Sequence, residues 1–501
     1  MDLFLPSSLA SSRLFFVGIK GTGMTALAEL CVSSGAFVEG SDVDEPFYTD
    51  EILSSLGVCI RDFSSEWIDS SWDCIVFSAA YDKSSHPQLV RAAQLGLPLV
   101  SYPEALGAFS QGFFSCGISG VHGKTSTTAI SGTLANAIGL PALSLTGSAV
   151  PLWGGRATIG PSYNVLSSPS IHFDKKKASF FIAETCEYRR HFMHFSPSCV
   201  LLTSVEPDHL DYFKDYKDIE SAFIDYTMKL PENGFFIYCA DNAGACSVAK
   251  HISGSRTDIN LISYGKIGDA SFRISGTEQL AGMQRFSVND RFSFSLKVPG
   301  EHMIENAVGA LALISVLAVK AGFSESFDSF IEDYYDKLSA AFLAFSGTRR
   351  RSEVVGETGG ILFIDDYGHH PTAIRSTIAG YRSFYPGRRI VVDFMSHTYS
   401  RTKALLDDFA ASFTDADIVI LHKIYASARE KSGDITGKDL YERVKERQDA
   451  VYYSHEVMDA MGLCRELLKP GDVFITMGAG NNWILGRELY KYYSNLEDKN
   501  I

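Results

Sequence analysis

The segment from Gly120 to Ser126 combines glycines, a lysine and hydroxyl side chains in an order that can bind phosphate. Glycines let backbone N–H groups converge on phosphate oxygens, Lys124 can reach the β- and γ-phosphate oxygens, and the Thr125 hydroxyl can ligate Mg²⁺. The segment departs from the strict pattern, because Ile118 stands five residues before Gly123 where a glycine is usual. A glycine turn followed by a surface lysine is the alternative. We expect nucleotide contacts from Gly120, His122, Gly123, Lys124, Thr125 and Ser126.

Acidic residues follow two of the short apolar stretches that we interpret as strands. Glu184 ends the stretch at 179–183, and Asp208 and His209 follow the stretch at 200–203 after a short loop. Mg²⁺ bound to nucleotide phosphates takes one or two protein oxygens, and a second ion can accept an imidazole nitrogen. Solvated acids with no metal are the alternative. The candidate metal ligands are Thr125, Glu184 and His209.

A glycine-rich turn near the N-terminus precedes an apolar helical stretch and suits a diphosphate. Gly18, Gly21 and Gly23 are similar to a dinucleotide fingerprint, and Asp42 falls at about the distance of its ribose-binding acid. The fingerprint, however, needs a glycine where Lys20 stands. We therefore expect a nucleotide-linked substrate and not NAD, since a dehydrogenase would leave the phosphate loop unexplained. A tight turn without a ligand is the alternative.

Two acids and two histidines fall within residues 365–371, a segment that ends in a proline suited to start a helix. We interpret the adjacent His369 and His370 as ligand contacts, with a satisfied loop network as the alternative. Arginines at 349–351 concentrate positive charge in an acidic protein, which suits phosphate oxygens. A solvated basic turn is the alternative there.

Two further features carry less chemistry. His191 and His194 have the spacing of metal ligands but no clear helix or strand to position them, so we expect them to pack. Cys186 has no flanking base in the sequence, so we expect an inert thiol.

Short apolar strands and helical stretches alternate along the chain and must carry these residues. The alternation is interrupted near residues 112 and 338, where we place domain boundaries. A Ser/Pro-rich stretch at 161–170 looks like an exposed loop. The expected strands are 14–17, 74–77, 113–118, 179–183, 200–203 and 235–238, and the expected helices are 25–32, 86–96 and 305–320.

The last third repeats the alternation and predicts a parallel sheet. Ligands gather at the carboxyl ends of the strands of such sheets. Polar residues and glycines follow the strands expected at 361–364, 390–392, 418–421 and 473–476; they are Asp365, Asp366, Asp393, His422, Gly478 and Gly480.

The bulk properties limit the class of protein. The chain has 501 residues and a formal net charge of −14, which argues against nucleic acid as a partner. Nine cysteines without a C-x-x-C pair indicate reduced thiols. Residues 1–12 lack a basic signal region, and the longest apolar stretch, 307–319, is too short to span a bilayer. We therefore expect a cytoplasmic enzyme that neither binds nucleic acid nor inserts into a membrane.

Taken in order, these stretches resemble the Mur ligase family over essentially the whole chain. The resemblance implies an α/β fold of three domains. They are a Rossmann-like domain for a UDP-sugar at 1–112, a central P-loop ATPase α/β domain at 113–338, and a Rossmann-like domain for the amino acid at 339–501. The similar blocks are 18–24, 40–42, 120–125, 184–192, 208–212, 299–302, 306–307 and 365–371.

The resemblance also implies roles for single residues. Lys124 holds the β- and γ-phosphates, Thr125 and Glu184 ligate one Mg²⁺, and His209 ligates a second. The implied ATP contacts are His302 and Asn306 at adenine, Asp366 at the ribose and Arg351 near the γ-phosphate. The implied UDP-sugar contacts are Gly21, Thr22, Gly23, Met24, Ser41 and Asp42, and the alanine and product contacts are Tyr367, His369, His397 and Arg401.

The likeness is strongest to the members that join L-alanine to the lactyl carboxylate of UDP-N-acetylmuramate, for peptidoglycan precursors. This implies ATP and two Mg²⁺ ions as cofactors, an acyl-phosphate intermediate, and a monomer or homodimer. His209 or His369 could deprotonate the alanine amine, and the choice stays open. The alternatives are a related ligase that attaches a preformed peptide and a nucleotide-gated binding protein without ligase activity.

Four positions depart from the usual family pattern and bear on fine substrate contacts. Met303 and Ser204 stand where asparagine is common, and Thr398 stands where arginine is common. Asn481 lies where an aspartate is common.

Overall fold

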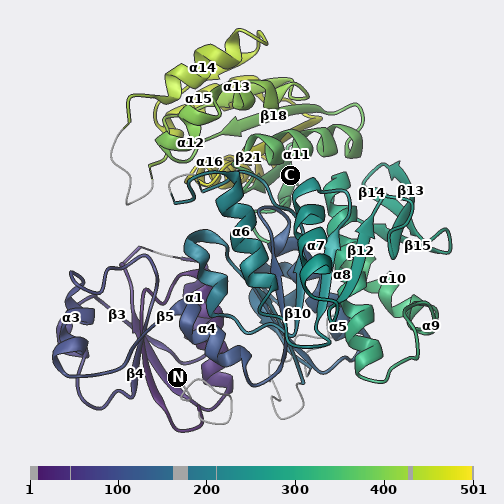
Figure 1. Cartoon of the computed structure of the whole chain (residues 1–501). Helices are drawn as coiled ribbons and strands as arrows, with labels where there is room; N and C mark the ends of the chain where they lie inside the picture. The colour runs from purple at the N-terminus through teal and green to yellow at the C-terminus, as the bar shows by residue number, and fades with distance from the viewer. Residues whose placement is uncertain (1–8, 46, 162–178, 210–211, 427–432, 499–501) are drawn as a thin grey trace. The chain divides into compact units, whose positions relative to one another are not determined.

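The computed structural model describes residues 9–45, 47–161, 179–209, 212–426 and 433–498 (Figure 1). Most of the loop expected at 161–170, and two residues of the block at 208–212, lie outside these ranges. The chain forms two compact units. The first comprises 1–275, 287–292 and 305–345, and the second comprises 276–286, 293–304 and 346–501.

The first sheet has five parallel strands in the order β3-β2-β1-β4-β5. The order reverses direction at β1, and ligands bind at such switch points in open sheets. The glycine-rich turn follows β1 and therefore opens at this point. The strands are β1 (Arg13–Val17), β2 (Phe37–Ser41), β3 (Cys59–Arg61), β4 (Cys74–Phe77) and β5 (Leu99–Ser101), and the helices are α1 (Thr22–Ser33), α2 (Thr49–Ser55), α3 (Pro87–Gln94) and α4 (Tyr102–Ser110).

The second sheet has the order β15-β14-β13-β12-β11-β10-β6-β9-β7-β8. Strand β6 lies between β10 and β9 and is parallel to both, so the three strands end at one edge. An antiparallel β7–β8 pair closes one end of the sheet. The strands are β6 (Phe114–Ser119), β7 (Ala142–Val150), β8 (Arg156–Ile159), β9 (Phe180–Glu184), β10 (Cys199–Leu202), β11 (Phe235–Cys239), β12 (Asn260–Gly265), β13 (Phe272–Leu280), β14 (Met283–Val288) and β15 (Phe292–Leu296).

Helices follow the strands of this sheet, and the functional loops lie where strand passes to helix. The loop after β6 leads directly into α5, which begins at Lys124. The 3₁₀ segment η5 (Tyr188–His194) follows β9. The helices are α5 (Lys124–Ile138), α6 (Tyr216–Thr227), α7 (Ala243–Ser255), α8 (Glu301–Lys320), α9 (Phe327–Asp333) and α10 (Tyr335–Ala344).

Helix α8 corrects one sequence prediction. The apolar stretch at 307–319 is too short to span a bilayer, but the helix that contains it has 20 residues and is long and apolar enough to do so. In the structure, 83% of its most apolar window is buried, as in the core helix of a globular fold. Burial, and not length, therefore argues against a membrane span here.

The third sheet has the order β16-β17-β21-β18-β19-β20. Four of its strands were expected and are parallel, as predicted; β20, also parallel, and β16, an antiparallel edge strand, were not among the expected strands. The strands are β16 (Glu353–Thr358), β17 (Ile361–Asp366), β18 (Arg389–Phe394), β19 (Ile418–Leu421), β20 (Val451–Tyr453) and β21 (Asp472–Met477). The helices are α11 (Pro371–Phe384), α12 (Tyr399–Ala404), α13 (Leu406–Ala410), α14 (Gly437–Lys445), α15 (Ala460–Leu467) and α16 (Trp483–Asp498).

Strand β17 shows why the strands of this sheet are continuous apolar runs in the sequence. Successive side chains of a strand point to opposite faces. Ile364 belongs to one buried cluster with Val392, and Phe363 belongs to another with Val391 and Phe474. Helices thus cover both faces of the sheet, as parallel sheets require.

Candidate active site

The phosphate loop joins β6 to α5 and depends on two glycines with left-handed backbone. Gly120 has φ 134° and Gly123 has φ 82°. A Cβ atom at Gly120 would overlap the Thr203 hydroxyl, and one at Gly123 would overlap the Asn306 side chain. Both the conformation and the close approach therefore require glycine.

Ser204 and Thr203, at the end of β10, hold this loop from the neighbouring strand. The Ser204 hydroxyl accepts a hydrogen bond from the His122 backbone N–H at 2.9 Å. The backbone carbonyl of Ser204 accepts one from the Val121 N–H at 3.0 Å. The Thr203 hydroxyl donates to the His122 carbonyl. Ser204 departs from the family pattern, and the structure gives it a role in shaping the loop.

Lys124 is held by a carboxylate that was not among the predicted site residues. Its ammonium donates to both oxygens of Glu187, at 2.8 and 3.0 Å, and to the Gly120 carbonyl. The two side chains are 13% and 3% exposed. Burial lowers the pKa of Lys124, but the charges of neighbouring acidic groups, Glu187 first among them, together with the hydrogen bond to Glu187 leave the pKa raised. The signal available in the sequence was an acid three residues after Glu184.

Thr125 and Glu184 meet at the start of α5 and form an oxygen pair. The Thr125 hydroxyl donates to Glu184 Oε1 at 3.1 Å, and Glu184 Oε2 accepts the Gly147 N–H at 2.7 Å. A Cβ atom at position 147 would crowd that carboxylate, so a glycine is needed beside it. Two oriented oxygens at this spacing fit the preference of Mg²⁺ for hard oxygen ligands.

His209 lies beside the same cluster. Its Nε2 atom is 3.7 Å from Glu187 Oε1 and 3.8 Å from Asp208 Oδ2, and its ring centre is 4.7 Å from that of Tyr188. The structure thus brings together Lys124, Thr125, Glu184 and His209, residues predicted from three separate parts of the sequence. These donors fit one or two divalent cations.

Asn306, near the start of α8, lies against the phosphate loop. Its side-chain oxygen accepts a hydrogen bond from the Thr127 hydroxyl at 3.3 Å. Ser126, also expected to contact nucleotide, is buried in the first turn of α5. In the second unit, the side chain of Gln284 donates to the Val298 and Gly300 carbonyls just before His302.

The glycine-rich turn of the first sheet is built around Asp42. This carboxylate accepts the Lys20 N–H at 2.7 Å and the Val43 N–H at 2.9 Å. The Lys20 ammonium donates to the Glu45 carbonyl at 2.8 Å, so the lysine that breaks the fingerprint supports the turn. The Thr22 and Tyr48 hydroxyls are 2.7 Å apart.

Ser41 and Met24, both expected at the UDP-sugar, lie in the interior of this part. The Ser41 hydroxyl is fully buried and donates to Gln88 at 2.6 Å, and Met24 is 4% exposed. Gly21 and Gly23 lie at the start of α1, and Gly23 faces Tyr102.

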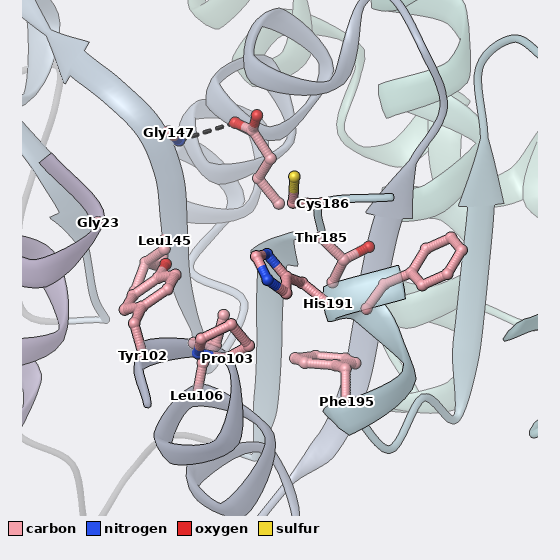
Figure 2. Close-up of a pocket in the computed structure, with 12 residues that line it drawn as sticks. Gly23, Tyr102, Pro103, Leu106, Leu145, Gly147, Thr185, Cys186, His191 and Phe195 are labelled. Carbon is pink, nitrogen blue, oxygen red and sulfur yellow. Dashed lines mark hydrogen bonds between the residues drawn. The ribbon is translucent and has the colours of Figure 1, made fainter. Parts of the chain in front are cut away.

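A pocket of about 200 Å³ lies beside Glu184, and Gly23 is among the residues that line it (Figure 2). Its lining includes the side chains of Glu184, His191, Tyr102 and Phe195. His191, which we expected to pack, is among the lining residues. It belongs to η5, a helical turn that the sequence pattern did not indicate.

Cys186 also borders this pocket. Surrounding protein atoms and the charge of Glu187 raise the pKa of its thiol to about 12. At neutral pH the thiol is therefore protonated, which agrees with the expectation of an inert side chain.

In the second unit, Asp365 and Asp366 end β17 and both are buried. Asp365 accepts from Arg350 Nε at 3.1 Å and from the Thr476 hydroxyl at 2.9 Å. Burial raises the pKa of Asp365 to about 6, against the opposing charge of Arg350. Asp366 accepts the Ser352 and Gly368 N–H groups, each at 2.7 Å.

An aromatic and cationic group follows these acids. The Arg351 guanidinium lies 5.0 Å from the centre of the Tyr367 ring, and the His369 ring lies 5.0 Å from it. His369 and His397 rings are 6.3 Å apart. His370, also expected to contact a ligand, accepts the Thr372 N–H and caps α11.

Thr398, a departure from the family pattern, and Asn482, which follows the departure at Asn481, each hold neighbouring groups in place. Thr398 has φ 68° and caps α12 by accepting the Arg401 N–H. Asn482, next to Asn481, donates to Asp393 Oδ1 at 2.9 Å and to the Met477 carbonyl at 3.1 Å. Asp393 in turn contacts His422 at 2.7 Å, with both side chains fully buried.

Comparison with known proteins places this fold and site in a family. The patterns described as "Mur ligase family, catalytic domain", "Mur ligase middle domain" and "Mur ligase, glutamate ligase domain" match residues 13–114, 118–314 and 350–480. The chain belongs to the Mur ligase family and has its three-domain α/β architecture.

Individual relatives are more specific. The UDP-N-acetylmuramate–L-alanine ligase of Treponema pallidum is 45% identical over 500 residues, 98% of each chain. The ligase of the same name from Borreliella burgdorferi is 39% identical over 479 residues, 95% of this chain and 97% of the relative.

Solved structures show the same fold at lower identity. The UDP-N-acetylmuramate-alanine ligase of Thermotoga maritima has a TM-score of 0.75 at 21% identity, covering 96% of this chain and 99% of that chain. A murein peptide ligase from Psychrobacter arcticus has a TM-score of 0.67 at 22% identity, covering 97% and 99%.

Proposed function

We propose that this protein is an ATP-dependent ligase that joins L-alanine to the lactyl carboxylate of UDP-N-acetylmuramate in peptidoglycan precursor synthesis. The observation that carries the proposal is the 45% identity, over 98% of both chains, to the Treponema pallidum ligase. The phosphate loop with Lys124 and the Thr125–Glu184 pair supports the ATP-dependent step.

The first step must activate a carboxylate, whose oxygen is a poor leaving group. A lactyl carboxylate oxygen attacks the γ-phosphorus of ATP, and the bond between that phosphorus and the oxygen bridging to the β-phosphate breaks. ADP departs, and the lactyl group becomes an acyl phosphate. Lys124 donates hydrogen bonds to the phosphate oxygens, and Arg351 adds positive charge near the γ-phosphate.

In the second step the alanine amine attacks the acyl carbon, and the bond to phosphate breaks to release inorganic phosphate. The amine must lose a proton, and His209 and His369 are the two candidate bases. His369 Nδ1 lies 2.9 Å from the Tyr367 carbonyl, which can only accept. Nδ1 therefore carries the hydrogen, and Nε2 is the basic nitrogen of the neutral ring.

Mg²⁺ fits the donor set beside the phosphate loop. Thr125 and Glu184 would hold one ion and His209 a second, while Asn306 and His302 would contact adenine and Asp366 the ribose. When bound, Mg²⁺ neutralises charge on the phosphate oxygens. Gly21, Thr22, Gly23, Met24, Ser41 and Asp42 would form the UDP-sugar site, and Tyr367, His369, His397 and Arg401 the alanine and product site.

We also propose that the protein acts in the cytoplasm, as a monomer or homodimer. All nine cysteines are free thiols, which suits a reducing compartment. The proposal requires that ATP and the UDP-linked sugar are available in that compartment.

Release of ADP and inorganic phosphate tests the function. Purified protein is given ATP, Mg²⁺ and UDP-N-acetylmuramate, with L-alanine, L-serine, glycine or a tripeptide as the amine. We expect release that depends on L-alanine, together with the amide product detected by mass spectrometry. Preference for the tripeptide would make the protein a peptide ligase, and ATP binding without amide product would make it a binding protein.

A further inference from the structure

One buried carboxylate contacts two residues of the candidate active site. Glu187 is 3% exposed, and both of its oxygens accept hydrogen bonds from the Lys124 ammonium. Its Oε1 atom also lies 3.7 Å from His209 Nε2. No role at the site was expected for Glu187, although it is the anionic partner closest to the lysine of the phosphate loop.

The chain after Glu187 is strained and firmly held. Arg189 and Arg190 have φ 52° and 56°, in the left-handed region that non-glycine residues rarely adopt. Arg190 pairs with Asp218 and Asp225 of α6, at 3.0 and 2.6 Å. The Arg190 N–H donates to the Glu187 carbonyl at 2.8 Å. Strain of this kind persists only where the surroundings fix it, so the position of Glu187 is specified.

The hydrogen bonds of Lys124 show what this position does. An ammonium has three N–H donors, and here four acceptors surround it: the two carboxylate oxygens of Glu187, the Gly120 carbonyl and, at 3.4 Å, the Val121 carbonyl. A phosphate oxygen that binds Lys124 must therefore replace one of these acceptors. The Glu187 carboxylate is negatively charged, as phosphate is. The carboxylate and a phosphate group cannot both keep full contact with the one Lys124 ammonium.

We propose that Glu187 is a positioning residue of the active site. It holds the Lys124 ammonium and the His209 imidazole in place before nucleotide binds, and it releases Lys124 to an oxygen of the triphosphate. We call the replacement of Glu187 by a phosphate oxygen the exchange at Lys124. The exchange concerns nucleotide binding alone, so this inference rests on the proposed function only where it predicts an effect on turnover.

Glu187→Gln tests the exchange, since glutamine keeps the size and one acceptor but removes the competing charge. ADP binding is measured by calorimetry with excess EDTA and without either other substrate. We expect about 5-fold tighter ADP binding, the size of a partly screened charge interaction. Turnover with all substrates should fall about 10-fold or more, because Lys124 and His209 lose their common partner.

The opposite directions of affinity and kcat distinguish positioning from a structural role, which would weaken both. Glu232→Gln, an exposed acid of the same part of the chain, is the matched control and should change neither. Glu187→Asp keeps the charge but shortens the side chain and weakens its contact with Lys124, so kcat should fall while ADP affinity rises less than in Glu187→Gln.

Weaker or unchanged ADP binding in Glu187→Gln would overturn the exchange, and tighter binding with normal kcat would overturn the positioning role. Melting temperatures of all three variants identify any that is misfolded, and Glu187→Asp then decides the kcat question by itself. If the wild type binds ADP but makes no amide, the proposed function fails while the exchange at Lys124 is still measured.

Discussion

Single residues of the candidate site are fixed by partners that lie far away in the sequence. Lys124 depends on Glu187, and Thr125 depends on Glu184, in each case through a hydrogen bond across about 60 residues of chain. Substitutions of these side chains therefore change charge balance as well as contact with nucleotide. Their effects are expected on turnover more than on folding.

Lys124→Ala should abolish ADP release that depends on L-alanine, by at least about 100-fold, because the ammonium stabilises charge on the transferring phosphoryl group. A coupled assay for ADP measures the loss, and Lys250→Ala on α7 serves as a surface control. Near-normal turnover in Lys124→Ala would contradict the assignment of this lysine.

Asp365 gives a prediction for pH. Its pKa is about 6 in the folded chain, above the ordinary value of 3.8, so the folded state binds more protons between these values. The free energy of unfolding contributed by this group is therefore greatest below pH 4 and declines as pH rises to about 6. Urea unfolding of wild type and Asp365→Asn at several pH values should show this slope only in the wild type. Parallel pH profiles for the two proteins would show that the pKa of Asp365 is not raised.

At the scale of elements, the ends of adjacent parallel strands shape each other's loops. The β10 end supplies Thr203 and Ser204 to the loop after β6, and the β9 end supplies Glu184 to the start of α5. The β18 end is tied to β19 through Asp393 and His422. Parallel neighbours bring such ends together because they share one edge of the sheet.

Ser204→Ala should weaken nucleotide binding without unfolding the protein. The His122 N–H would lose its acceptor, a loss of about 1 kcal/mol, so the Kd for ADP should rise about 5-fold. Calorimetry measures the Kd, and Ser253→Ala on the exposed side of α7 is the control. An unchanged Kd would mean that the loop keeps its shape without Ser204.

At the scale of the whole molecule, the first sheet and strands β6 to β12 of the second sheet belong to one compact unit. Helix α1 packs against β7 and β8, and Leu27 shares a buried cluster with Leu145 and Ala157. Within this contact Glu29 forms an ion pair with Arg156, and the side chains are 1% and 8% exposed.

Glu29→Ala should lower the free energy of unfolding of this unit by about 3–5 kcal/mol, because it leaves the Arg156 charge buried and unpaired. Urea unfolding followed by fluorescence measures the change. The double variant Glu29→Met with Arg156→Leu, which removes both charges, should regain most of it. Equal stability of Glu29→Ala and wild type would show that solvent reaches Arg156.

Much of the fold could be predicted from the sequence, because its strands are buried runs bounded by glycines and acids. The parallel arrangement of β17, β18, β19 and β21 was predicted in this way, and the family was predicted from the motifs. The edge strand β16 was not, since its half-exposed residues carry no clear alternation.

At the site, motif residues such as Lys124 and Glu184 were predictable because their chemistry needs a fixed residue type. Glu187 and His191 were not assigned roles, since their positions depend on the strained turn at Arg189 and Arg190. The spacing of residues in the sequence does not predict that backbone conformation.

The joint formed by α1 with β7 and β8 has a consequence for engineering this enzyme. Exchanging residues 1–112 for the corresponding module of a relative would place a foreign helix on the native hairpin. In a chimaera that keeps Arg156 and Ala157, the foreign α1 would pack against a β7–β8 hairpin whose buried side chains do not match it. Grafts that transfer the hairpin together with the N-terminal module should give soluble, active hybrids more often.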